Sequence, residues 1–173
     1  AQGPSDDYVV RWTGTPMASA DYYVEVDCVT SNNERPLGAG TRKPAGTGDA
    51  NSDGYVYLYE PAVQAKLYRV ADSARTLLTT GTAGVISAST TYINTRLESN
   101  GSTHTGTRDG AADVAATTDA TYATGVPFLM MGDFGGNTTG RFNNFEAADL
   151  AAADPEGSLI GGKLLRGGLL IHG

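Results

Sequence analysis

The chain has 173 residues, of which 40% are hydrophobic, and its formal net charge is −7. This length corresponds to one domain with a full hydrophobic core. The negative charge gives no attraction toward phosphate backbones, so a nucleic-acid partner is not expected. Cys28 is the only cysteine, which excludes an internal disulfide and a thiolate metal cluster within one chain. No run of 18 apolar residues is present, so membrane insertion is not expected either.

The first segment with strand character is residues 21–30, where apolar and polar side chains alternate with a period of two. One face carries Tyr22, Val24, Val26 and Cys28, and the other carries Tyr23, Glu25, Asp27 and Val29. Because Cys28 shares a face with two valines, we expect it to be a small core residue and not a nucleophile. The opposite face is expected to be the solvated side of a half-buried strand.

Residues 49–60 fit the pattern D-x-N-x-D-G followed by five residues and a Glu, as in an EF-hand calcium loop. Such a loop needs flanking helices, whereas this one follows a Gly-rich segment and precedes an alternating one. A strand over 54–60 spans roughly 20 Å, which places Glu60 too far away to share an ion. Asp49, Asn51 and Asp53 therefore predict an ordinary turn first, with a partial calcium site on these three residues as the alternative.

The same segment contains a row of tyrosines, because Tyr55, Tyr57 and Tyr59 alternate with Val56 and Leu58. If Val56 and Leu58 face the core, the tyrosines form an outward ladder with about 6.6 Å between neighbours. Such a ladder can contact a glycan or a protein. Cross-strand packing of the tyrosines on the second face of the sheet is the alternative.

Further strands and hairpins follow along the chain. Residues 65–70 and 75–80 flank a predicted hairpin turn, and Asn100-Gly101 predicts a type I′ turn that Asp109-Gly110 repeats. Two more strands are expected within 126–134 and 140–148. Short strands without intervening helices predict an all-β fold, and we favour an antiparallel β-sandwich over a barrel.

Several of these segments together resemble the concanavalin A-like, or laminin-G-like, jelly roll. The resemblance rests on "DYYVEVDCVT", "AKLYRVADSARTLLTTG", "TTYINTRLESNGSTHTGTRDG" and "GRFNNFEA", which lie within residues 8–147. Asn143 departs from the closing motif, in which the family usually has Asp. The resemblance implies a module of the kind found in bacteriophage virion proteins and secreted bacterial proteins.

Laminarinase-type glycoside hydrolases share this jelly roll and carry a strand with the pattern E-x-D-x-(x)-E, whose carboxylates perform retaining hydrolysis. Glu25 and Asp27 match the first two positions, but Val29 and Thr30 occupy the place of the third. The two histidines, His104 and His172, have no G-x-S-x-G elbow to complete a serine hydrolase. We therefore expect that the protein is not an enzyme.

The C-terminal segment differs in composition from the rest of the chain. Asp154-Pro155 marks a break, which divides the chain into a sandwich domain over residues 1–149 and a Gly/Leu-rich arm over residues 150–173. Large aliphatic side chains in this arm require a covering partner in water. They are Leu159, Ile160, Leu164, Leu165, Leu169, Leu170 and Ile171. We expect the arm to add strands to a neighbouring subunit, with packing on its own domain as the alternative.

Together these patterns predict a non-catalytic structural or adhesive module that forms oligomers through its arm. The expected location is a virion surface, as a capsid decoration or fibre protein, with other virion subunits or copies of itself as partners. The alternative is a secreted lectin-like module that binds surface glycans, with calcium as its one candidate cofactor.

Overall fold

The computed structural model describes residues 8–13, 17–30, 36–44, 53–60, 63–72, 74–82, 89–131 and 140–150. These ranges contain β-strands and no helix, which confirms the expected all-β antiparallel sandwich of jelly-roll type. Within them, no helix has the length and hydropathy of a membrane span. The strands are β1 (Tyr8–Arg11), β2 (Tyr22–Thr30), β3 (Leu37–Lys43), β4 (Gly54–Tyr59), β5 (Lys66–Ala71), β6 (Ala74–Thr80), β7 (Ser89–Asn100), β8 (Thr103–Arg108), β9 (Ala111–Thr118), β10 (Val126–Met131) and β11 (Arg141–Asp149).

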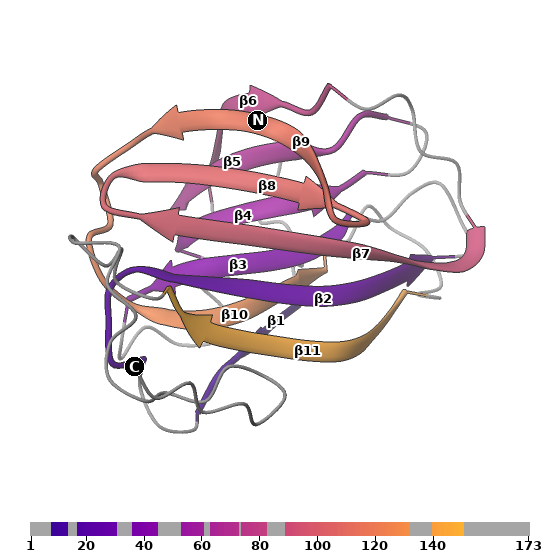
Figure 1. Ribbon diagram of the computed structural model, residues 1–173, viewed down its shortest axis with the longest axis horizontal. Helices are drawn as coiled ribbons and strands as arrows, with labels where there is room; N and C mark the ends of the chain where they lie inside the picture. The colour runs from indigo at the N-terminus through magenta and orange to yellow at the C-terminus, as the bar shows by residue number, and fades with distance from the viewer. Residues whose placement is uncertain are drawn as a thin grey trace, which may run out of the picture.

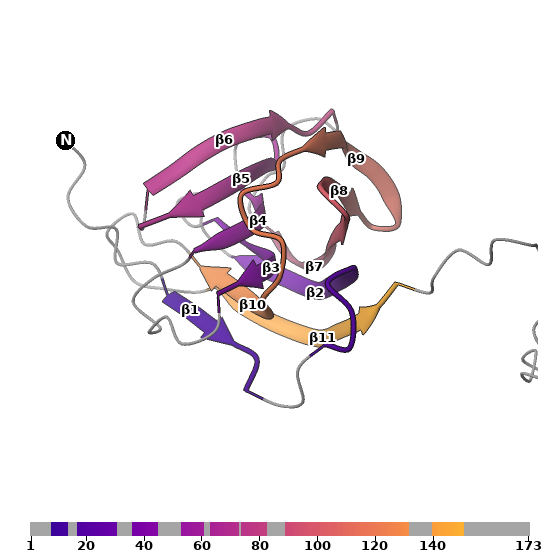
Figure 2. The same cartoon turned by 90° about the vertical axis from the view of Figure 1, so that its left-hand side faces the viewer.

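The strands form two layers that pack face to face (Figures 1 and 2). The six-stranded sheet has the order β1-β10-β3-β4-β5-β6, and the five-stranded sheet has the order β11-β2-β7-β8-β9. All neighbouring strands run antiparallel. Strands that are distant in sequence therefore meet in the five-stranded sheet, where β2 lies between β7 and β11.

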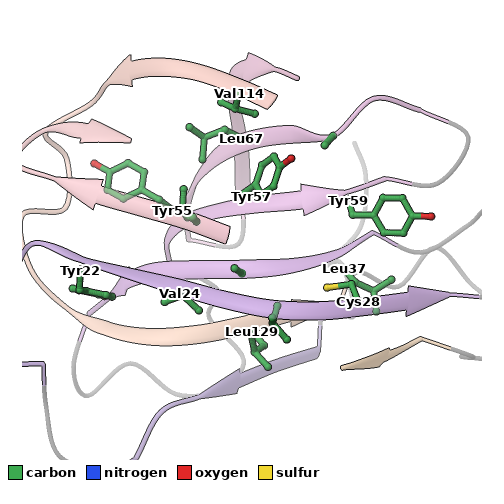
Figure 3. Close-up of a cluster of buried hydrophobic side chains, with 14 residues drawn as sticks. Tyr22, Val24, Cys28, Leu37, Tyr55, Tyr57, Tyr59, Leu67, Val114 and Leu129 are labelled. Atoms are coloured by element: carbon green, nitrogen blue, oxygen red, sulfur yellow. The ribbon is translucent and has the colours of Figure 1, made fainter. Parts of the chain in front are cut away.

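The main core lies between the two sheets, as Figure 3 shows. Tyr22, Val24, Val26 and Cys28 of β2 all point into it and are fully buried, which confirms the alternation expected for residues 21–30. Cys28 is free, and its burial raises the pKa of its thiol to about 12. The thiolate is therefore scarce at neutral pH, as suits a core residue.

The expected outward tyrosine ladder is wrong, because Tyr55, Tyr57 and Tyr59 point between the sheets (Figure 3). Their exposed fractions are 0%, 0% and 1%. Tyr57 donates a hydrogen bond to Asp113 Oδ2 at 2.5 Å, and Tyr55 donates one to Asp119 Oδ1 at 2.8 Å. Carboxylates within the fold thus satisfy two of the hydroxyl groups, which permits their burial. The three tyrosines therefore belong to the core and are not part of the outer surface.

A second apolar cluster lies on the other side of the six-stranded sheet. It contains Val56 and Leu58 of β4, together with Val70, Phe128 and Met130. The Phe128 ring occupies the space above Gly40, where an added Cβ would lie 2.4 Å from the ring. Both faces of β4 are therefore buried, which the alternation of tyrosines with aliphatic residues did not reveal.

The hairpin turns are in the expected places, with one shift of register. Asp109 and Gly110 both have positive φ, 49° and 76°, as a type I′ turn requires, and they connect β8 to β9. The β7–β8 hairpin closes with the pair Asn100↔Thr103, so its two loop residues are Gly101 and Ser102. The predicted turn at Asn100-Gly101 is thus wrong by one residue, because Asn100 belongs to the strand ladder.

Candidate functional site

The outer face of the five-stranded sheet carries an ordered set of polar side chains, built by alternation on three adjacent strands. This sheet is turned toward the viewer in Figure 1. Since Val24, Val26 and Ile93 pack in the core, their neighbours in β2 and β7 project outward. We call the following residues the polar face: Tyr23, Glu25 and Asp27 of β2, Tyr92, Asn94, Arg96 and Glu98 of β7, and Asn144 and Glu146 of β11.

Asn94 holds the centre of the polar face. Its side-chain Nδ2 donates one hydrogen bond to Glu25 Oε1 at 2.9 Å and another to Asp27 Oδ1 at 3.0 Å. Both amide hydrogens are then occupied, so the orientation of the amide is fixed. Within the described ranges, no contact uses Asn94 Oδ1, which remains as an acceptor for a ligand.

Arg96 lies beside this centre and ties two strands together. Its guanidinium group is 3.5 Å from Glu25 Oε2 and 3.1 Å from Glu98 Oε2. The Cζ atom lies 3.6 Å from the centroid of the Tyr23 ring, which is within the range of a cation–π contact. Each of these side chains is about one-third exposed or less, so each ion pair contributes little to stability, about 1 kcal/mol at most. The contacts mainly fix geometry.

β11 closes the lower side of the polar face. Tyr23 donates a hydrogen bond to Glu146 Oε1, and this bond is the main cause of a raised pKa of Tyr23. Asn144 donates from Nδ2 to Asp27 Oδ2 at 2.7 Å. Asn144 has a φ of 49°, and the register of β11 against β2 shifts at this point. This β-bulge aims the Asn144 side chain at Asp27, a common function of bulges.

Tyr92 provides an exposed aromatic ring on the same face. Alternation places it on the side of Asn94, about 6.6 Å further along the strand. The side chain is 41% exposed, as one of five exposed large hydrophobic side chains among the described residues. A half-exposed ring beside fixed hydrogen-bonding groups can stack on one side of a ligand while those groups bind its polar atoms.

The interior contains a second group of polar side chains, which are linked by hydrogen bonds. It includes a serine and a histidine, as a catalytic site would, but its geometry is not that of a catalytic site. Ser99, His104 and Thr41 are fully buried, with Thr41 Oγ1 2.7 Å from Ser99 Oγ and Ser99 Oγ 2.9 Å from His104 Nδ1. His104 Nε2 lies 3.0 Å from the backbone oxygen of Asp119, so Nε2 carries the proton and Nδ1 accepts from Ser99. Among the described residues, no carboxylate forms a hydrogen bond with the ring, and Ser99 is fully buried, so a ligand cannot reach it. This group is structural.

The calcium prediction falls mostly outside the described residues. Asp49 and Asn51 lie there, and Asp53 is described at the start of β4. Asp53 Oδ1 accepts a hydrogen bond from the backbone N–H of Asp72 at 2.8 Å. At the other end of the motif, Glu60 follows β4 and binds Lys66 and Tyr68 at 2.6 and 2.7 Å. This strand confirms that residues 49–60 are not an EF-hand, while a partial site at Asp49, Asn51 and Asp53 stays a prediction.

Among the described residues, no three His, Cys, Asp or Glu side chains are grouped so that they could hold a metal ion. The aliphatic residues of the C-terminal arm, Leu159 to Ile171, and His172 lie outside the described ranges.

The sequence interpretation named Glu25 and Asp27 but missed their partners on β7. Residues 92–98 read "YINTRLE", in which Tyr92, Asn94, Arg96 and Glu98 share one face. This alternation was a usable signal, since a strand with one aromatic and three hydrogen-bonding side chains on one face differs from an ordinary solvated strand. The pairing of β7 with β2 was the missing information.

Comparisons with solved structures find the same sandwich in several proteins. The carbohydrate binding module CBM66 from Bacillus subtilis matches with a TM-score of 0.67 and 15% identity, over 83% of this chain and 82% of that one. A tetrameric galectin from the sponge Cinachyrella sp. matches with a TM-score of 0.56 and 12% identity, over 82% and 99%. These identities show a shared jelly-roll fold and nothing finer.

A third similar structure is a mutant of the GH43 protein BlXynB from Bacillus licheniformis. It matches with a TM-score of 0.51 and 14% identity, over 76% of this chain but only 28% of that chain. The similarity therefore concerns one part of a longer protein. No protein-family profile matches the chain, and no curated protein matches it in sequence.

Proposed function

We propose that this protein is a non-catalytic carbohydrate-binding module, and that the polar face is its glycan site. The single observation that carries the proposal is the position of the exposed Tyr92 ring beside Asn94, whose amide is fixed by Glu25 and Asp27. The fold supports it, because one similar structure is titled a carbohydrate binding module and another is a galectin.

Sugar rings offer two kinds of surface, and the polar face matches both. Their C–H faces stack on aromatic rings such as that of Tyr92. Their hydroxyl groups bind fixed planar amides and carboxylates, here Asn94, Glu25 and Asp27. Because protein contacts hold these groups in place before a ligand arrives, binding costs less conformational entropy than it would with free side chains.

A glycan array followed by calorimetry on the best ligand tests the proposal. We expect Tyr92→Ala and Asn94→Ala each to weaken binding about tenfold, which corresponds to roughly 1.4 kcal/mol. Leu77→Ala is the matched control, because Leu77 is also an exposed large apolar residue but belongs to β6 of the other sheet. Silence on the array, or equal losses in all three variants, would remove the proposal.

The absence of catalysis is part of the proposal. Glu25 and Asp27 both accept hydrogen bonds from the amide of Asn94, and Val29 and Thr30 stand where laminarinase-type hydrolases carry the third carboxylate, so β2 supplies no acid/base partner. A retaining hydrolase needs one of its two carboxyls protonated as the general acid. Reducing-sugar release from any glycan that the protein binds, abolished by Glu25→Gln, would contradict this part.

We also propose that residues 159–171 of the arm associate with a neighbouring copy along the edges of the two sheets formed by β1 and β11. β1 and β11 are edge strands of their sheets. The side chains of Val10 in β1 and of Trp12 just after it are 61% and 42% exposed. Edge strands with apolar neighbours accept an added strand. Size-exclusion chromatography of the full chain and of a chain ending at Leu150 tests this. Equal elution as monomers would count against it.

An extracellular location follows from the proposed glycan ligand and agrees with the similarity to a bacterial carbohydrate binding module. None of the similar structures reported above is a virion protein, so we prefer the glycan-binding function to the capsid decoration or fibre role. Calcium at Asp49, Asn51 and Asp53 remains a separate proposal. Titration calorimetry with calcium, and glycan binding with and without chelator, test it.

A further inference from the structure

The ligand-facing atoms of the polar face are mostly hydrogen-bond acceptors. Its carboxylates are Glu25, Asp27, Glu98 and Glu146, and an ionised carboxylate only accepts. Asn94 donates both of its amide hydrogens, to Glu25 and Asp27, so its oxygen atom is the part left for a ligand. Asn144 donates one amide hydrogen to Asp27.

Two donor side chains of this face are already engaged. Arg96 is paired with Glu25 and Glu98 and lies on the Tyr23 ring. The Tyr23 hydroxyl donates to Glu146. Arg141 lies at the end of β11 opposite Val29, two positions along β2 from Asp27, and brings a second guanidinium group to the same side of the sheet. Four carboxylates therefore face two guanidinium groups, and the local charge is negative.

The balance of hydrogen-bond acceptors, donors and charge on the polar face determines which glycans it can bind. A ligand must supply donors, which hydroxyl groups and ammonium groups do. A carboxylate or sulfate on the glycan would add acceptors and a like charge, which the face repels. A protonated amine would add the attraction between opposite charges to its hydrogen bond with a carboxylate such as Asp27, whereas a neutral hydroxyl group supplies the hydrogen bond alone.

We infer that the polar face prefers glycans that carry protonated amines, such as glucosamine oligosaccharides, over neutral glycans, and that it excludes uronate and sulfated glycans. This inference rests on the proposed glycan-binding function and specifies its ligand class. Tyr92 stacks on the sugar ring while Asp27, Glu25 and Asn94 Oδ1 receive its donors. The preference is electrostatic, so it decreases as salt is added.

The test uses four oligosaccharides of equal length: deacetylated chito-oligosaccharide, its N-acetylated form, a neutral β-glucan and an oligo-uronate. Calorimetry at low salt, and at a pH where the amine is protonated, should give the deacetylated form about tenfold tighter binding than the N-acetylated one. Added salt should reduce this ratio, and the uronate should not bind. The double variant Glu25→Gln with Asp27→Asn should bring the ratio close to one.

Asp72→Asn is the matched control for the charge change. Asp72 is exposed at the turn between β5 and β6 with a φ of 50°, a conformation that Asn also tolerates. This variant should keep the full preference. Tighter binding of the N-acetylated, neutral or uronate ligand would overturn the inference and leave the glycan-binding function intact. Failure to bind any glycan, on the array or here, would overturn both.

Discussion

The outer faces of the two sheets differ more than their common architecture suggests. On the six-stranded sheet, the outward residues of β4 and β10 are apolar and fully buried, with Val56, Leu58, Phe128 and Met130 in one cluster. On the five-stranded sheet, the outward residues of β2 and β7 are polar and partly exposed, and they bind one another. Buried apolar contacts are thus concentrated on one outer face, and partly exposed hydrogen-bonding groups lie on the other.

The largest effect should come from a truncation in the apolar cluster. Phe128→Ala removes a buried ring that packs over Gly40, so we expect a loss of about 3–5 kcal/mol in the free energy of unfolding, measured by urea denaturation. Tyr92→Ala on the polar face is the paired variant, with an expected change within about 0.5 kcal/mol. Similar losses in the two variants would show that the faces do not differ in this way.

An intermediate effect on stability is expected from a change of pH. It should come from the buried polar group around His104 and not from the exposed polar face. Burial lowers the pKa of His104, an effect that Arg42 reinforces and the hydrogen bond to Asp119 opposes. The unfolded chain therefore binds a proton before the folded protein does. This contribution to stability is complete above pH about 6.5 and is lost as the pH falls below that value, at no more than about 1.4 kcal/mol per pH unit.

The measurement compares urea denaturation of the wild type and His104→Gln above and below pH 6.5, the ordinary pKa of histidine. The variant lacks the titrating ring, so its stability should fall less steeply with acid. Parallel curves for the two proteins would show that His104 does not contribute.

A smaller effect should follow from Arg96→Ala on the polar face. The variant loses two partly exposed ion pairs and the contact with the Tyr23 ring, for which we expect at most about 1 kcal/mol at low salt. The difference from wild type should shrink as salt screens the pairs. A loss of several kcal/mol, independent of salt, would mean that this face carries fold stability after all.

The smallest effect is expected from Tyr23→Phe. Removing the hydroxyl group that binds Glu146 should change stability by about 0.5 kcal/mol, because water replaces it at this exposed position. Spectrophotometric titration provides a second readout. The wild type should contain a tyrosine that titrates late because of Glu146, and this component should be missing in the variant.

Much of the fold could be predicted from local patterns. The alternation of residues 21–30 identified the buried side of β2, and Asp109-Gly110 identified a type I′ turn. The same logic gave a wrong answer for β4, because alternation shows which residues share a face but not which face is inside. Two of the tyrosines, Tyr55 and Tyr57, can be buried because the carboxylates of Asp119 and Asp113, distant in sequence, accept hydrogen bonds from their hydroxyl groups.

The sequence by itself determined the class of the fold, the buried thiol of Cys28 and the presence of two carboxylates on one face of β2, since each depends on neighbours within one strand. Only the tertiary structure decided what surrounds those carboxylates. Asn94 and Asn144 reach Asp27 from strands on either side of β2, separated from it by 67 and 117 positions in the chain. The physical reason is that a sheet's surface is assembled across strands, whereas alternation is read along one.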